Sequence, residues 1–180
     1  YSDGAGLEFI AYEADDIRVD LRNPYLREDQ MLRVMSRSLQ IYQHRHAGAV
    51  PGRIVVHKNT EFRRDEISGC MAAFSNVKDV ELLQVQTRHG WQGMLFNEPG
   101  KADGYPSHRG QALAIGENEV LLWTQGIIPT IGQGSGYYKE GKGIPRPLLI
   151  TRFAGRGDFY DVCRETLALT KMNWNNDGPY

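Results

Sequence analysis

The sequence predicts an α/β domain built on one mixed sheet that is flanked by helices. Two observations support this fold class. In residues 1–90, apolar β-prone runs alternate with runs of helical spacing, in the β-α-β-α-β order typical of layered α/β domains. In residues 91–153, short β-prone runs follow one another, and an amphipathic helical run comes after them.

The first half of the chain supplies the alternating part of this pattern. Strands are expected at residues 6–12, 53–57 and 80–87. Helices are expected at residues 28–47 and 65–74. The apolar face of the longer helix consists of Leu32, Met35, Leu39 and Tyr42. Gly48 is its expected C-terminal cap, because glycine adopts the left-handed conformation that often ends a helix.

The second half supplies the shorter strands. They are expected at residues 91–96, 111–115, 120–124 and 147–153. A last helix is expected from residue 158 to about residue 172, with an inward face made of Phe159, Val162, Cys163 and Leu167. Because no repeat and no long linker divides the chain, we expect residues 1–180 to form the core of one domain.

Composition places the chain among ordinary soluble proteins, with 41% hydrophobic and 24% charged residues. No apolar stretch approaches the roughly 20 residues that a membrane span requires. The chain starts without an initiator Met or a leader, which indicates that Tyr1 is a cut point inside a longer protein. Cys70 and Cys163 form neither a CxxC motif nor a disulfide framework. We therefore expect a cytoplasmic protein without a membrane partner.

Charge is unevenly distributed along the chain, although the net charge is only −1. Residues 22–64 contain nine Arg or Lys and three acids, and residues 137–157 contain five Arg or Lys and one acid. Such clusters form either a groove for phosphates or merely solvated faces. Charge alone favours the solvated faces.

Residues 136–142 match GxxxxGK, the pattern of a phosphate-binding loop. A working loop continues with Ser or Thr and then a helix. Here Gly143 follows, and Pro145 and Pro147 prevent a helix, so we exclude a nucleotide hydrolase. Two interpretations stay open: a hairpin tip, or a loop whose aromatic and basic side chains bind nucleic acid. The side chains concerned are Tyr137, Tyr138, Lys139, Lys142 and Arg146.

Asn59 is the most informative polar residue, because it lies in the polar turn at the end of the expected strand at residues 53–57. Two-metal nucleases place a carboxylate at such a strand end, since paired Mg²⁺ ions need anionic oxygen ligands. Asparagine is neutral and binds Mg²⁺ weakly. Asp65 and Glu66 begin the next expected helix, where capping explains them. The five histidines show no metal-ligand spacing, and no GxSxG motif is present.

Several segments together resemble the PIWI domain of prokaryotic Argonautes, especially the long type that often lacks cleavage activity. They are GLEFIAYEADD, LRNPYLREDQMLRVMSRSLQIYQHRHAG, RIVVHKNTEF with DEISGC, GKGIPRPLLITRFAG and LALTKMNWNND. The resemblance covers essentially the whole chain, with the motifs in the family's order. It implies an RNase H-like fold and a role in holding a guide strand paired with its target.

The resemblance also implies a degenerate catalytic tetrad. The second Asp of the family's metal-binding set falls at Asn59, and none of residues 22–24, where the glutamate finger is expected, is an acid. The first and fourth positions fall outside residues 1–180. The implied function is guide-directed nucleic-acid binding in host defence against invading DNA, without catalytic residues and without a metal at the degenerate site. The alternative is an active, divalent-metal-dependent endonuclease that uses Glu61 or Asp65, and a domain that binds no nucleic acid is a third possibility.

Binding residues and partners follow from the same resemblance. The expected nucleic-acid-binding residues are Lys58, Arg88, Lys139, Lys142, Arg146, Lys171, Asn173 and Asn175. The expected partners are a short guide RNA or DNA, its complementary target, the remaining Argonaute domains and an associated effector protein. A Mg²⁺ ion at the guide 5′ end is expected outside this chain.

Overall fold

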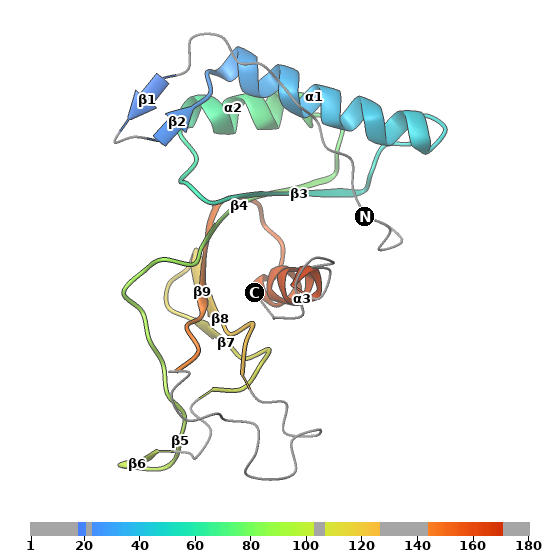
Figure 1. Cartoon of the computed structure of the whole chain (residues 1–180). Helices are drawn as coiled ribbons and strands as arrows, with labels where there is room; N and C mark the ends of the chain where they lie inside the picture. Colours follow the sequence, from blue (N-terminus) through green and yellow to red (C-terminus); the bar gives the residue numbers. More distant parts are fainter. Residues whose placement is uncertain (1–17, 21–22, 103–106, 127–143, 171–180) are drawn as a thin grey trace. The chain divides into compact units, whose positions relative to one another are not determined.

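A computed structural model of the chain describes residues 18–20, 23–102, 107–126 and 144–170 (Figure 1). The helices are α1 (Glu28–Arg45), α2 (Arg64–Ala73) and α3 (Phe159–Leu169). The strands are β1 (Arg18–Asp20), β2 (Asn23–Tyr25), β3 (Arg53–Lys58), β4 (Asp79–Gln86), β5 (Phe96–Glu98), β6 (Lys101–Ala102), β7 (Ala112–Ala114), β8 (Glu119–Leu122) and β9 (Leu148–Ala154).

The main sheet has five strands in the order β3-β4-β9-β8-β7. The pairs β4–β9, β8–β9 and β7–β8 are antiparallel. Two small antiparallel pairs, β1–β2 and β5–β6, lie outside this sheet. The fold is α/β, a mixed sheet flanked by helices, which confirms the predicted fold class.

The described residues divide into two compact units. The N-terminal unit comprises residues 1–56 and 61–80, and the C-terminal unit comprises residues 57–60 and 81–180. Strands β3 and β4 contribute residues to both units. In the described parts of both units, no helix has the length and the apolar composition that crossing a bilayer requires.

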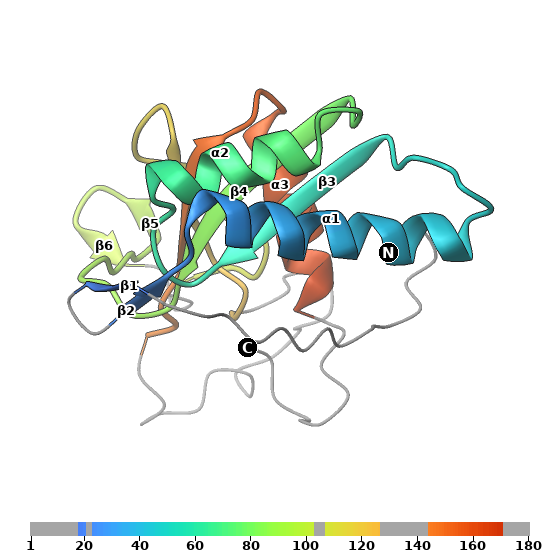
Figure 2. The same ribbon diagram turned by 90° about the horizontal axis from the view of Figure 1, so that it is seen from above.

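In the N-terminal unit, α1 and α2 lie side by side (Figures 1 and 2). Gly69 of α2 is buried at their contact, where a Cβ atom would lie 2.5 Å from the carbonyl oxygen of Glu28. The two helix backbones approach this closely because residue 69 has no side chain. The Glu66 carboxylate is 1% exposed and accepts the backbone N–H groups of Arg63, at 2.9 Å, and Leu26, at 3.3 Å. Glu66 therefore caps α2, as predicted.

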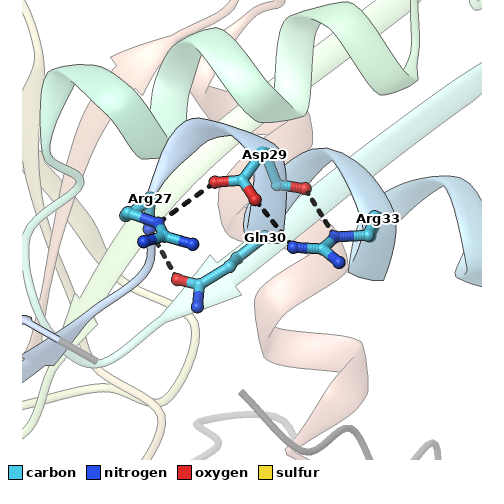
Figure 3. Close-up of polar contacts among 4 residues, drawn as sticks. All are labelled: Arg27, Asp29, Gln30 and Arg33. Atoms are coloured by element: carbon cyan, nitrogen blue, oxygen red, sulfur yellow. Dashed lines mark hydrogen bonds and ion pairs between the residues drawn. The ribbon is translucent and has the colours of Figure 1, made fainter. Parts of the chain in front are cut away.

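Charged side chains at the start of α1 satisfy one another (Figure 3). Asp29 accepts from Arg27 Nε at 3.2 Å and from Arg33 Nη2 at 2.7 Å, and the Arg27 backbone N–H donates to Gln30 Oε1 at 3.0 Å. Desolvation alone would raise the pKa of Asp29, but the two arginines outweigh it and hold this pKa below its ordinary value. Arg27 and Arg33 therefore stabilise the ionised Asp29 carboxylate in the first turn of α1.

In the C-terminal unit, α3 and the sheet share an apolar core. Leu82, Leu83 and Ile150 of β4 and β9 are fully buried. The inward face of α3 includes Val162 and Cys163, which are 0% and 5% exposed and were predicted to face the core. Asp158 caps α3 by accepting the backbone N–H of Tyr160 at 2.9 Å.

Most expected elements lie within a few residues of their predicted bounds. Helix α1 ends two residues earlier than expected, with His46 as its C-terminal cap, and Gly48, with a φ of 83°, donates its N–H to Gln43 O at 2.7 Å. The strand predicted at residues 91–96 is wrong, because β5 begins only at Phe96. The Trp91 N–H donates to the side chain of His89 at 3.2 Å, which takes the place of a ladder hydrogen bond. The strand expected at residues 6–12 lies outside the described residues.

Candidate nucleic-acid interface

The end of β3 is fixed to β4 by a hydrogen bond from a nearly buried side chain. Lys58 is the last residue of β3, and the exposed Asn59 follows it. Gln84 of β4, 9% exposed, donates from Nε2 to the Asn59 carbonyl oxygen at 3.3 Å. The backbone at this strand end is thereby fixed to β4. The side chain presented there is a neutral amide.

Nearby acids have structural roles. The Glu61 carboxylate lies 3.0 Å from Arg63 Nη2, and Glu66 caps α2 as described above. Within the described ranges, no three His, Cys, Asp or Glu side chains are grouped so that they hold a metal ion.

Two arginines lie just beyond one end of the β4–β9 ladder. The register pairs Val85 with Ile150 and Gln86 with Leu149; Arg88 follows Gln86 by two residues, and Arg146 precedes Leu148, the first residue of β9, by two residues. Both arginines are exposed.

A histidine fastens this ladder end. His89 Nε2 donates to the Pro147 carbonyl oxygen at 2.8 Å, and His89 Nδ1 accepts the Trp91 N–H at 3.2 Å. These partners require the neutral tautomer that carries its proton on Nε2. The ring therefore joins the residue after Arg88 to the residue after Arg146.

The surroundings of this arginine pair contain no nearby negative charge along the sequence. Residues 85–97 and 144–157 include no Asp or Glu. Among the described residues, no carboxylate forms an ion pair with Arg88 or Arg146. Two exposed guanidinium groups in such surroundings favour an anionic partner, and guanidinium geometry suits phosphate.

The structure thus brings together some of the predicted binding residues. Arg88 and Arg146 are each followed by a residue of the His89–Pro147 hydrogen bond, and the backbone of Asn59, directly after Lys58, is bonded to Gln84 of β4. Outside the described residues lie Lys139, Lys142, Lys171, Asn173 and Asn175. The role of His89, which joins the end of β4 to the start of β9 through Pro147, was not predicted from the sequence. Its position shortly after a strand and directly after a basic residue could have indicated that role.

The comparisons with known proteins agree with this geometry at the level of the fold. No family model and no curated protein matches the chain. Two solved structures of Aquifex aeolicus Argonaute superpose with TM-scores of 0.55 and 0.54, at 18% and 20% identity, over 88% and 87% of this chain. A third, Argonaute of the same organism with externally bound siRNA, has a TM-score of 0.52 at 18% identity over 82% of this chain.

The chain therefore has an Argonaute PIWI-like fold, as the resemblance implied. It spans only about a fifth of the length of these Argonaute structures, between 19% and 20%.

Proposed function

We propose that this chain is the PIWI module of an Argonaute-type protein, and that it holds a short guide strand with its target. The proposal is carried by Arg88 and Arg146, two exposed arginines on an Argonaute-like fold whose neighbouring residues, His89 and Pro147, are joined by a hydrogen bond. Phosphate backbones are recognised mainly by such cations, independently of base sequence.

We further propose that the module does not cleave. Asn59 occupies the strand end at which the resemblance calls for an acid, and its neutral amide supplies no anionic oxygen to a pair of divalent metals. Glu61, a replacement ligand in the alternative proposal, is paired with Arg63, so metal binding would have to displace an existing ion pair. These two facts support the non-cleaving function over the nuclease.

The remaining parts of the proposal concern the whole protein. The other Argonaute domains complete the guide channel, and a Mg²⁺ ion assists at the guide 5′ end outside this chain. A cytoplasmic guide–target complex acts in defence against invading DNA by engaging an associated effector protein.

A cleavage and binding assay on the intact protein tests this proposal. Guides and matched targets of RNA and DNA are offered in all four combinations, with Mg²⁺ or Mn²⁺. We expect a stable complex, an affinity that falls steeply with salt, and an uncut target, because phosphate contacts remain while a metal ligand is lost.

Metal-dependent cutting at one defined phosphodiester would overturn the non-cleaving part of the proposal. The matched variants Glu61→Gln and Asp65→Asn then show whether either acid is the replacement ligand. A protein that binds no guide at any salt concentration overturns the nucleic-acid proposal itself.

A further inference from the structure

Trp91 presents an unusually large aromatic surface close to the arginine pair. Its side chain is 49% exposed, and Met94 and Phe96 in the same segment are 44% and 58% exposed. Large apolar side chains are usually at least partly covered, so three exposed ones within six residues mark a binding surface. The segment follows directly after Arg88 and His89.

The backbone around Trp91 is anchored on both sides. On one side, the Trp91 N–H donates to His89 Nδ1, and the same imidazole is bound to the Pro147 carbonyl oxygen. On the other side, Gly93 lies so close to the indole of Trp123 that a Cβ atom would overlap the ring. Trp123 itself is 4% exposed and belongs to the apolar core. The exposed indole therefore stands on a supported backbone.

Charge identifies the kind of ligand that this surface suits. The His89 ring is bonded to the Trp91 backbone N–H and to the Pro147 carbonyl oxygen, so the exposed indole stands on the same fastened pair of segments that carries the exposed Arg88 and Arg146. No acid occurs in residues 85–97. An aromatic face beside arginines is the arrangement by which proteins hold single strands, with a base stacked on the ring and phosphates on the cations. A protein or lipid partner would not require both features at one place.

We infer that Trp91 is a stacking platform for one unpaired nucleotide of the strand whose phosphates Arg88 and Arg146 bind. The nucleotide is unpaired because the bases inside a duplex already stack on both of their faces. This inference rests on the proposed function and adds a base contact to it. Stacking needs only the flat face of a base, so the site accepts any of the bases.

Abasic scanning of a bound strand tests the platform in the intact protein. Single abasic sites are placed at successive positions of a short guide-length oligonucleotide, and dissociation constants are measured for the wild type, Trp91→Ala and Trp91→Phe. We expect one position at which loss of the base weakens wild-type binding by about 5-fold or more, the effect typical of one base–aromatic stack. Trp91→Phe should keep most of this effect.

In Trp91→Ala, loss of the base at that position should have no further effect, because its partner is already gone. Tyr160→Ala is the matched control, since Tyr160 is an aromatic residue on α3 with 69% exposure, and its scan should follow the wild type. The dependence of affinity on salt should stay unchanged in Trp91→Ala, because no phosphate contact is removed.

Three results overturn the platform. If Trp91→Ala shows the same dependence on the position of the abasic site as the wild type, no base stacks on this residue. If Trp91→Ala weakens binding equally at every abasic position, the variant has lost structure and not a base contact. In both cases the proposed function stands if Arg88→Ala still lowers the dependence on salt. If the wild type binds no strand at all, the proposed function fails, and the platform fails with it.

Discussion

The two ends of the β4–β9 ladder place arginines in opposite surroundings. At one end, Arg152 is 10% exposed and its Nε lies 2.8 Å from Oε2 of Glu81, which is fully buried. Arg152 Nη2 donates to the Gly157 carbonyl oxygen, and the Gly157 N–H donates to Glu81 Oε1, both at 2.7 Å. The guanidinium also lies 4.1 Å above the ring of Phe159. At the other end, Arg88 and Arg146 are exposed without an ion-pair partner among the described residues.

This difference shows that burial and a nearby carboxylate make an arginine structural, whereas exposure leaves an arginine available for a ligand. A buried guanidinium must be paired, because burying an unpaired charge costs several kcal/mol. Arg152 is thus held by its carboxylate, and it joins β9 to the start of α3. An exposed arginine incurs no such cost and stays available for a phosphate. The comparison predicts that changes at the two ends affect different properties of the protein.

Arg152→Ala should have the largest effect on stability. It leaves the Glu81 carboxylate buried without its cation, which typically costs about 3–5 kcal/mol. The expected result is faster hydrogen exchange of β9 and α3 amides in the intact protein. Removing both charges, with Arg152→Met and Glu81→Leu together, should be less damaging than Arg152→Ala alone. If Arg152→Ala leaves the exchange of these amides unchanged, the ion pair does not hold this ladder end.

Cys163 lies on α3, the helix whose start Arg152 joins to β9, and it makes a smaller contribution to stability. Burial, together with the nearby Asp158 charge, raises the pKa of this thiol from its ordinary 9.0 to about 11. The neutral thiol is thus favoured in the fold, so its contribution to stability is present below pH 9 and is lost as pH rises to about 11. Two pKa units correspond to on the order of 2–3 kcal/mol.

The measurement for Cys163 is its alkylation rate in the intact protein as a function of pH. The thiolate is the nucleophile, so the rate should reach half its maximum near pH 11. In denatured protein the midpoint should return to about 9. A native midpoint that equals the denatured one would show that α3 leaves this thiol open to water.

Local periodicity was sufficient to predict most of the fold. The apolar spacing of α1 and α3 predicted both helices, and the run VELLQVQT predicted β4 to within one residue at each end. The polar turn after β3 likewise predicted that Asn59 stands at a strand end. These features depend on neighbours in the sequence, which is why one chain without a structure reveals them.

Contacts between distant residues could not be predicted in this way. Glu81 lies inside a strand expected to be apolar, and only the cation of Arg152 on β9 explains its burial. His89 and Pro147 are 58 residues apart, so the link that brings Arg88 to Arg146 follows from strand register alone. The Trp91 segment looked like a strand because its composition is apolar, whereas its large side chains, those of Trp91, Met94 and Phe96, are exposed.

Arg88→Ala with Arg146→Ala should have the smallest effect on stability and a clear effect on binding. Both side chains are exposed, so the free energy of unfolding should change by no more than about 0.5 kcal/mol. Each lost phosphate contact should lower the slope of log affinity against log salt by about 1, so the double variant should lower it by about 2.

Arg156→Ala is the matched control, because Arg156 is exposed in the same unit but lies away from this ladder end. An unchanged slope in the double variant, or an equal change in the control, would mean that net charge and not this arginine pair holds the strand. A changed slope at unchanged stability would separate the two ends of one ladder into a structural end and a binding end.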